Sequence, residues 1–191
     1  MTENETLSTW IKNSTRDMVA LETLLTSIPA IAPESGGNGE SEKCAALEAW
    51  LLQAGFSKSQ FVHLDAPDTR VKSGVRPNLL VTIPGKSDDF AIWVMAHMDV
   101  VPTGELSLWE SDPWTVVEKD GKLFGRGVED NQQGLVSAAF AGLYSTKMLI
   151  SICLSTYVIY IVTSLIDTPF VYLARWIFNR FMKNENNHEM C

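Results

Sequence analysis

The sequence predicts an α/β domain over residues 1–144 and an apolar helical tail over residues 145–191. Segments with helical periodicity alternate with short apolar runs that are typical of strands. All 12 glycines lie at or before Gly142. The net charge is −9 up to residue 144, from 20 acidic and 11 basic residues, and +1 beyond it, from three acidic and four basic residues. These differences place a domain boundary near residue 145.

Two helices are predicted in the first third of the chain. Residues 14–27 carry apolar side chains at helical spacing, and Ser14 or Thr15 is the expected N-cap. Residues 40–55 form the second helix, which Gly55 closes because glycine readily adopts the left-handed conformation that follows a helix end.

Strands and a further helix are predicted next. Residues 61–65 and 78–85 are short apolar runs typical of strands. Residues 90–99 are apolar on both faces, which predicts a central strand covered by helices. Residues 121–127 indicate a short strand or turn, and residues 131–144 begin another helix. The alternation favours a layered α/β domain.

Charge and cysteine usage limit the partners and the compartment. The net charge of −8 argues against nucleic acid, because nucleic-acid binders concentrate positive charge. Three distant cysteines without a CxxC pair predict free thiols rather than a disulfide framework or a thiolate zinc site. The first ten residues lack the basic and apolar regions of a secretory signal, so we expect a cytoplasmic protein.

The tail leaves several interpretations open. Residues 148–166 run for 19 residues without a charge, close to the roughly 20 that span a bilayer, with Trp176 as an interfacial residue. Basic residues beyond this run would favour placing the acidic domain outside the cell, which argues against an anchor. The alternatives are a core helix, or the product of a frameshifted or prematurely ended reading frame.

Two sequence features suggest a metal site. His97 and Asp99 end the third apolar run, and side chains two residues apart on a strand face the same side. An imidazole in such a place can ligate a metal while a carboxylate orients it. Residues 121–134 form a glycine-rich turn that carries Glu129 and Asp130. Asp130 is a candidate second ligand, because a carboxylate can bridge two ions about 3.5–4 Å apart. The alternative is a polar strand end and a solvated acidic turn.

The motifs "HMDVVPTG", "DPW" and "DGKLFGRGVEDNQQG", in this order, give the first 144 residues a recognisable pattern. It resembles the zinc metallopeptidase and amidohydrolase family that includes acetylornithine deacetylase, succinyl-diaminopimelate desuccinylase, aminoacylase and carboxypeptidase G. The resemblance implies part of a three-layer α/β/α zinc-exopeptidase-like catalytic domain. It also implies a hydrolase acting on amide bonds of N-acyl amino acids or short peptides.

The same resemblance implies roles for three residues. His97 would ligate one of two Zn²⁺ ions, with Co²⁺ or Mn²⁺ as alternatives. Asp99 would be the catalytic residue that orients His97, and Asp130 would bridge both ions. The peptide bond between Asp130 and Asn131 would be cis.

The sequence also departs from the family pattern. The adjacent Glu-Glu pair that supplies the general base and a ligand is missing, Asp167 stands alone, and Gln132 occupies a position where many relatives have lysine. We therefore expect a truncated chain with little or no activity, and no homodimer because the dimerising insert of the family is missing. The alternative function is a noncatalytic, membrane-tethered module held through residues 148–166.

Overall fold

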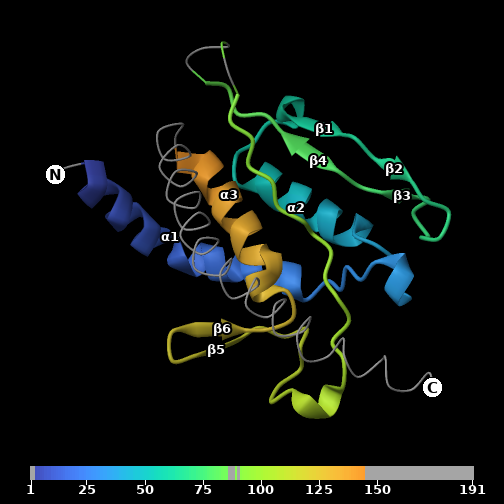
Figure 1. Ribbon diagram of the computed structural model, residues 1–191. Helices are drawn as coiled ribbons and strands as arrows, with labels where there is room; N and C mark the ends of the chain where they lie inside the picture. Colours follow the sequence, from blue (N-terminus) through green and yellow to red (C-terminus); the bar gives the residue numbers. More distant parts are fainter. Residues whose placement is uncertain (1–2, 86–88, 90, 145–191) are drawn as a thin grey trace, which may run out of the picture. The chain divides into compact units, whose positions relative to one another are not determined.

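The computed structural model describes residues 3–85, 89 and 91–144, and these combine helices with short strands (Figure 1). The helices are α1 (Glu3–Thr26), α2 (Ser41–Gln53) and α3 (Gln133–Tyr144). The strands are β1 (Phe61–His63), β2 (Ala66–Pro67), β3 (Val75–Arg76), β4 (Leu79–Val81), β5 (Val117–Lys119) and β6 (Lys122–Phe124). The mixed α/β character that the sequence predicts is confirmed.

The hydrophobic core lies where the three helices meet. Leu21 and Leu25 of α1 are completely buried, and they belong to one apolar cluster with Leu47 of α2 and Phe140 of α3. The Phe140 ring also lies 5.2 Å from that of Trp50. Burial of apolar side chains is the main stabilising term in folding, so this cluster holds the three helices together.

The start of α1 differs from its expected position. The helix begins at Glu3, and the expected N-cap region lies in its interior, where the Thr15 hydroxyl donates to the Ile11 carbonyl at 3.0 Å. A threonine hydroxyl can bond four residues back within a helix, so its presence does not require a helix start. The end of the helix, at Thr26, agrees with the prediction.

The end of α2 follows the local rule that predicted it. Gly55 has a φ of +110°, and its N–H donates to the Leu52 carbonyl at 3.2 Å. The next N–H, from Phe56, donates to the Leu51 carbonyl at 3.1 Å. This pair of hydrogen bonds is the Schellman arrangement, which satisfies carbonyls that the helix leaves without partners.

The described strands form three antiparallel pairs, β1 with β4, β2 with β3, and β5 with β6. The prediction of a central strand over residues 90–99 is wrong for the described residues, because residues 91–99 form no strand. Trp93 and Met95 are 69% and 85% exposed. An apolar run becomes a strand only beside a hydrogen-bonding partner, and no described strand pairs with this segment.

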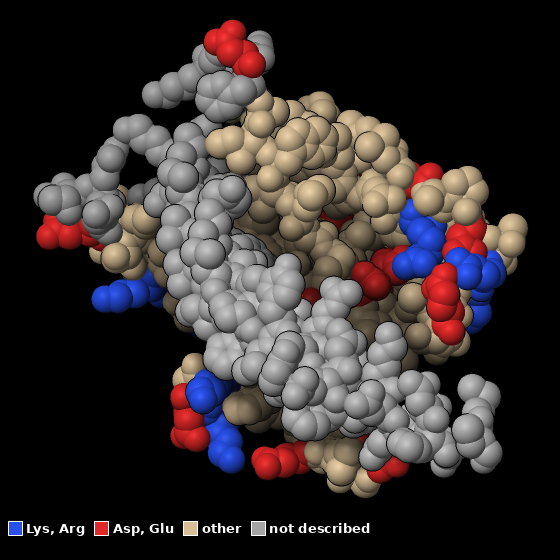
Figure 2. Space-filling model, viewed as in Figure 1, with Lys and Arg blue, Asp and Glu red and all other residues tan. Residues whose placement is uncertain are grey.

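Charged side chains of opposite sign lie next to one another on the surface. On the face shown in Figure 2, groups of Lys and Arg side chains gather beside Asp and Glu side chains. Arg70 contacts both Asp68 and Glu34 at 2.7 Å, and Arg76 forms an ion pair with Glu40. These contacts tie the loop before α2 to the β2–β3 hairpin.

The apolar tail, residues 145–191, lies outside the described residues, so its boundary, its helical character and the membrane alternative stay predictions. Within the described ranges, none of the helices combines the length and the apolar character that a membrane span requires.

Candidate metal site

The first part of the site is fixed where the extended segment of residues 91–99 ends. Val100 forms an isolated parallel bridge with Ile31, and its N–H donates to the Ala30 carbonyl at 2.9 Å. Its side chain is only 5% exposed. This anchor holds His97 and Asp99 against the loop that follows α1, although the preceding residues are exposed.

The second part of the site is a tight turn between β6 and α3. Gly127 has a φ of +82°, and a Cβ atom there would lie 2.5 Å from a methyl group of Val100, so only glycine fits this contact. A kinked turn follows over Val128–Gln132, in which Asp130 and Asn131 have non-helical backbone angles, and it is closed by a hydrogen bond of 3.0 Å from the Gln132 N–H to the Gly127 carbonyl. The peptide bond between Asp130 and Asn131 is cis, as the resemblance implied.

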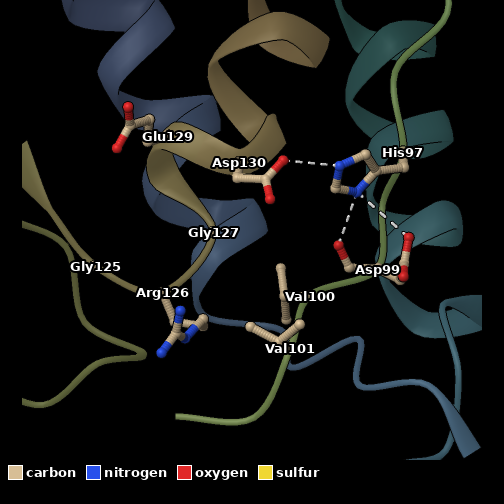
Figure 3. Close-up of a pocket in the computed structure, with 9 residues that line it drawn as sticks. All are labelled: His97, Asp99, Val100, Val101, Gly125, Arg126, Gly127, Glu129 and Asp130. Carbon is tan, nitrogen blue, oxygen red and sulfur yellow. Dashed lines mark hydrogen bonds and ion pairs between the residues drawn. The ribbon is translucent and has the colours of Figure 1, made fainter. Parts of the chain in front are cut away.

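These two parts bring His97 and Asp130 together across 33 residues of sequence (Figure 3). His97 Nε2 lies 3.0 Å from Asp130 Oδ1. On the other side of the ring, Nδ1 lies 3.0 Å from the Asp99 backbone carbonyl and 3.3 Å from Asp99 Oδ1. All three predicted site residues line one open pocket of about 370 Å³.

The surroundings of His97 determine which ring nitrogen carries a proton. A carbonyl oxygen can only accept a hydrogen bond, so Nδ1 must donate to Asp99. In the neutral ring Nε2 then has a lone pair, and that lone pair faces the carboxylate oxygen of Asp130. Two acceptors at 3.0 Å attract one another only when a cation lies between them, either a proton or a metal ion.

The electrostatics agree with this description. Partial burial of His97 opposes its protonation and lowers its pKa. Hydrogen bonds to the Asp99 carbonyl and the Asp130 carboxylate, with the charges of both aspartates, outweigh burial and raise the pKa above its ordinary value. The site therefore favours positive charge at Nε2.

The donor atoms suit two positions of a zinc site. Zinc binds histidine nitrogen and carboxylate oxygen at about 2.0–2.2 Å, so two donors at tetrahedral positions lie about 3.3 Å apart. The 3.0 Å separation of His97 Nε2 and Asp130 Oδ1 is close to this value. Among the described residues, no group of three or more His, Cys, Asp or Glu side chains is placed to hold a metal. Among the described residues, His97 and Asp130 are therefore the two side chains that fit as metal ligands. The Asp130 side chain is 89% exposed.

Contacts that sequence reasoning missed hold the loop beside the site. The Arg126 guanidinium lies 5.0 Å from the centre of the Trp109 ring, and its Nη2 donates to the Thr103 carbonyl at 3.3 Å. Trp109 Nε1 donates to the same carbonyl at 2.9 Å. The glycine-rich motif includes Arg126, but no spacing rule could indicate that this residue contacts Trp109.

Comparison with known proteins gives the site a context. Residues 93–144 match peptidase family M20/M25/M40. An uncharacterized metallohydrolase from Methanocaldococcus jannaschii is 33% identical over 130 residues, which are 64% of this chain and 30% of that protein. A second, from Methanococcus maripaludis, is 35% identical over 67% of this chain and 31% of its own length. A succinyl-diaminopimelate desuccinylase from Delftia acidovorans is 36% identical over 61% of this chain and 28% of its own length.

The aligned residues span about three tenths of the length of these curated relatives. The resemblance seen in the motifs is therefore confirmed.

Proposed function

We propose, from the match of residues 93–144 to peptidase family M20/M25/M40, that this chain forms part of a metal-dependent hydrolase. The substrates proposed are amides of N-acyl amino acids or short peptides. One observation carries the proposal: the Asp99 carbonyl holds the proton of the neutral His97 ring at Nδ1, and the free Nε2 lies 3.0 Å from Asp130 Oδ1.

Each of the three site residues has a distinct task in this proposal. His97 and Asp130 would hold the metal ion, and Asp99 would keep the imidazole in the tautomer that leaves Nε2 free to ligate. A bound divalent ion supplies Lewis acidity toward an amide carbonyl and makes water a stronger nucleophile. The open pocket beside Asp130 gives a small substrate access to this point.

We further propose a three-layer α/β/α catalytic domain, two Zn²⁺ ions bridged by Asp130, and a cytoplasmic location. The relatives named desuccinylases support an N-succinyl amino acid as one substrate to test. Because the sequence lacks the Glu-Glu pair and a general base is typically worth about 10²- to 10⁴-fold, we expect this chain by itself to hydrolyse slowly or not at all.

Metal binding is therefore the experiment that tests the proposal. The purified chain is titrated with Co²⁺, and the visible absorption of the bound ion and the heat of binding are measured. We expect His97→Ala and Asp130→Ala each to weaken binding by more than about 100-fold, because loss of a ligand exceeds the about 10- to 100-fold typical of groups that only support ligands.

The chain offers a matched control. His63 Nε2 also lies 3.0 Å from a carboxylate, that of Glu48, on an exposed part of β1. Its Nδ1, however, lies 3.8 Å from the Asp65 carboxylate, beyond hydrogen-bond distance, so this contact does not fix the tautomer as the Asp99 carbonyl does for His97. His63→Ala should leave Co²⁺ binding unchanged. The proposal is wrong if the chain does not bind Co²⁺, or if His63→Ala weakens binding while His97→Ala does not.

A further inference from the structure

A buried polar cluster lies behind the turn that carries Asp130. It joins Glu22 and Thr26 of α1, Lys43 of α2 and Gln132 of the turn, and none of these side chains is more than 3% exposed. Buried charged groups are costly unless they have partners, so the cluster needs a complete set of hydrogen bonds to be tolerated.

Gln132 is the centre of this cluster. Its Oε1 accepts from Lys43 Nζ at 2.7 Å, and its Nε2 donates to Thr26 Oγ1 at 2.8 Å and to Glu22 Oε1 at 3.2 Å. The lysine ammonium can only donate, so the amide oxygen must face it and the orientation of the amide is fixed. A single neutral side chain thereby bonds to a buried lysine and a buried carboxyl group.

The cluster is connected to the site through the backbone of the turn. Gln132 follows Asp130 by two residues, and its N–H closes the turn on Gly127. The Asp130 side chain is largely exposed, so its position is set by this backbone and not by packing around the carboxylate. Whatever anchors Gln132 therefore also places Asp130.

We propose that Gln132 is a positioning residue for the metal site, because its buried amide fixes the turn that presents Asp130 to His97. This inference rests on the proposed function, because the Asp130 carboxylate that Gln132 positions is one of the two proposed metal ligands. The anchors come from α1 and α2, so the site depends on the packing of both helices against the turn.

An isosteric exchange across one hydrogen bond tests this role. Above a pH of about 7, where Glu22 is ionised, Gln132→Glu keeps the acceptor for Lys43 but places a second carboxylate against Glu22 and removes the donor to Thr26. Adding Glu22→Gln restores a donor and an acceptor across the same contact and returns the cluster to its original net charge. The Glu22→Gln/Gln132→Glu double variant is therefore the matched rescue of the single variant.

The measurement is a Co²⁺ titration of the full chain above a pH of about 7, so that Glu22 is ionised, under conditions where circular dichroism shows each variant to be folded. We expect Gln132→Glu to weaken Co²⁺ binding about 10- to 100-fold, the range typical of groups that support metal ligands, and the double variant to restore it. Leu47→Ala, in the core on the same helix as Lys43, should lower stability without changing Co²⁺ affinity. Equal weakening by Leu47→Ala, or a double variant as weak as the single one, would overturn the inference.

A second measurement separates this inference from the proposed function. In the metal-free chain, the ¹⁵N chemical shifts of the His97 ring report on its contact with Asp130. Gln132→Glu should move these shifts and the double variant should restore them, whether or not Co²⁺ binds. If wild type does not bind Co²⁺ but the shifts follow this pattern, the proposed function fails and the positioning role stands. If Gln132→Glu leaves the shifts unchanged, the positioning role fails.

Discussion

Glu22 should make the stability of this protein fall as the pH rises from about 4.5 to about 7. Burial raises the pKa of this carboxyl from 4.5 to about 7, even though the Gln132 hydrogen bond and the Lys43 charge act in the opposite direction. Between these two values the unfolded chain has released the proton and the folded chain still holds it. The unfolded state is thus favoured progressively as the pH rises through this window.

The size of the effect follows from the two pKa values. One pH unit corresponds to about 1.4 kcal/mol, so a pKa raised from 4.5 to about 7 corresponds to about 3 kcal/mol of folding free energy lost across the window. Because the side chain is only 3% exposed, screening by solvent does not reduce this value much. This is a large part of the 5–15 kcal/mol that is typical of whole domains.

The assay compares wild type with Glu22→Gln, which keeps an acceptor for Gln132 but cannot ionise. Urea unfolding is measured from pH 4.5 to 7.5 in the presence of a chelator, so that metal binding does not contribute. The free energy of unfolding of wild type, relative to the variant, should fall by about 3 kcal/mol. A difference that stays constant with pH, or that grows in favour of wild type, would refute the burial of Glu22 as a proton-binding acid.

Three further perturbations test other parts of the structure by urea unfolding. Burial lowers the pKa of Lys43 from 10.5 to about 8, so wild type should gain stability between these values, and Lys43→Met should not. Phe140→Ala should cost about 3–5 kcal/mol, because this ring is buried against two tryptophans; a cost under about 1 kcal/mol would contradict the core. Gly127→Ala should destabilise more than Gly121→Ala, since both have positive φ but only the first would clash with Val100; equal costs would contradict that contact.

The sequence predicted those parts of the fold that depend on local signals. The end of α2 at Gly55 is a local signal, because one residue with positive φ satisfies the last carbonyls of the helix. Residues 90–99 gave the wrong prediction for a nonlocal reason. An apolar run indicates that its side chains favour burial. A strand also requires a neighbouring strand to bond with, and the local sequence does not identify that neighbour.

The candidate site was predictable in its residues but not in its contacts. The order of the motifs identified His97, Asp99 and Asp130, and the structure brings all three together. The cluster around Gln132 was not predicted, although one signal for it was present. Lys43 lies four residues before Leu47 on the apolar face of α2, and a lysine on such a face requires a buried partner.

The two proposed ligands, His97 and Asp130, lie close together although the described residues 91–99 pair with no strand. Val100 is bonded to the loop after α1 on one side and contacts the Gly127 turn on the other, so it joins the segment of His97 to the turn of Asp130. Met95, five residues earlier, is almost fully exposed. The separation of His97 and Asp130 is therefore set by packing at Val100 and by the anchors of the turn.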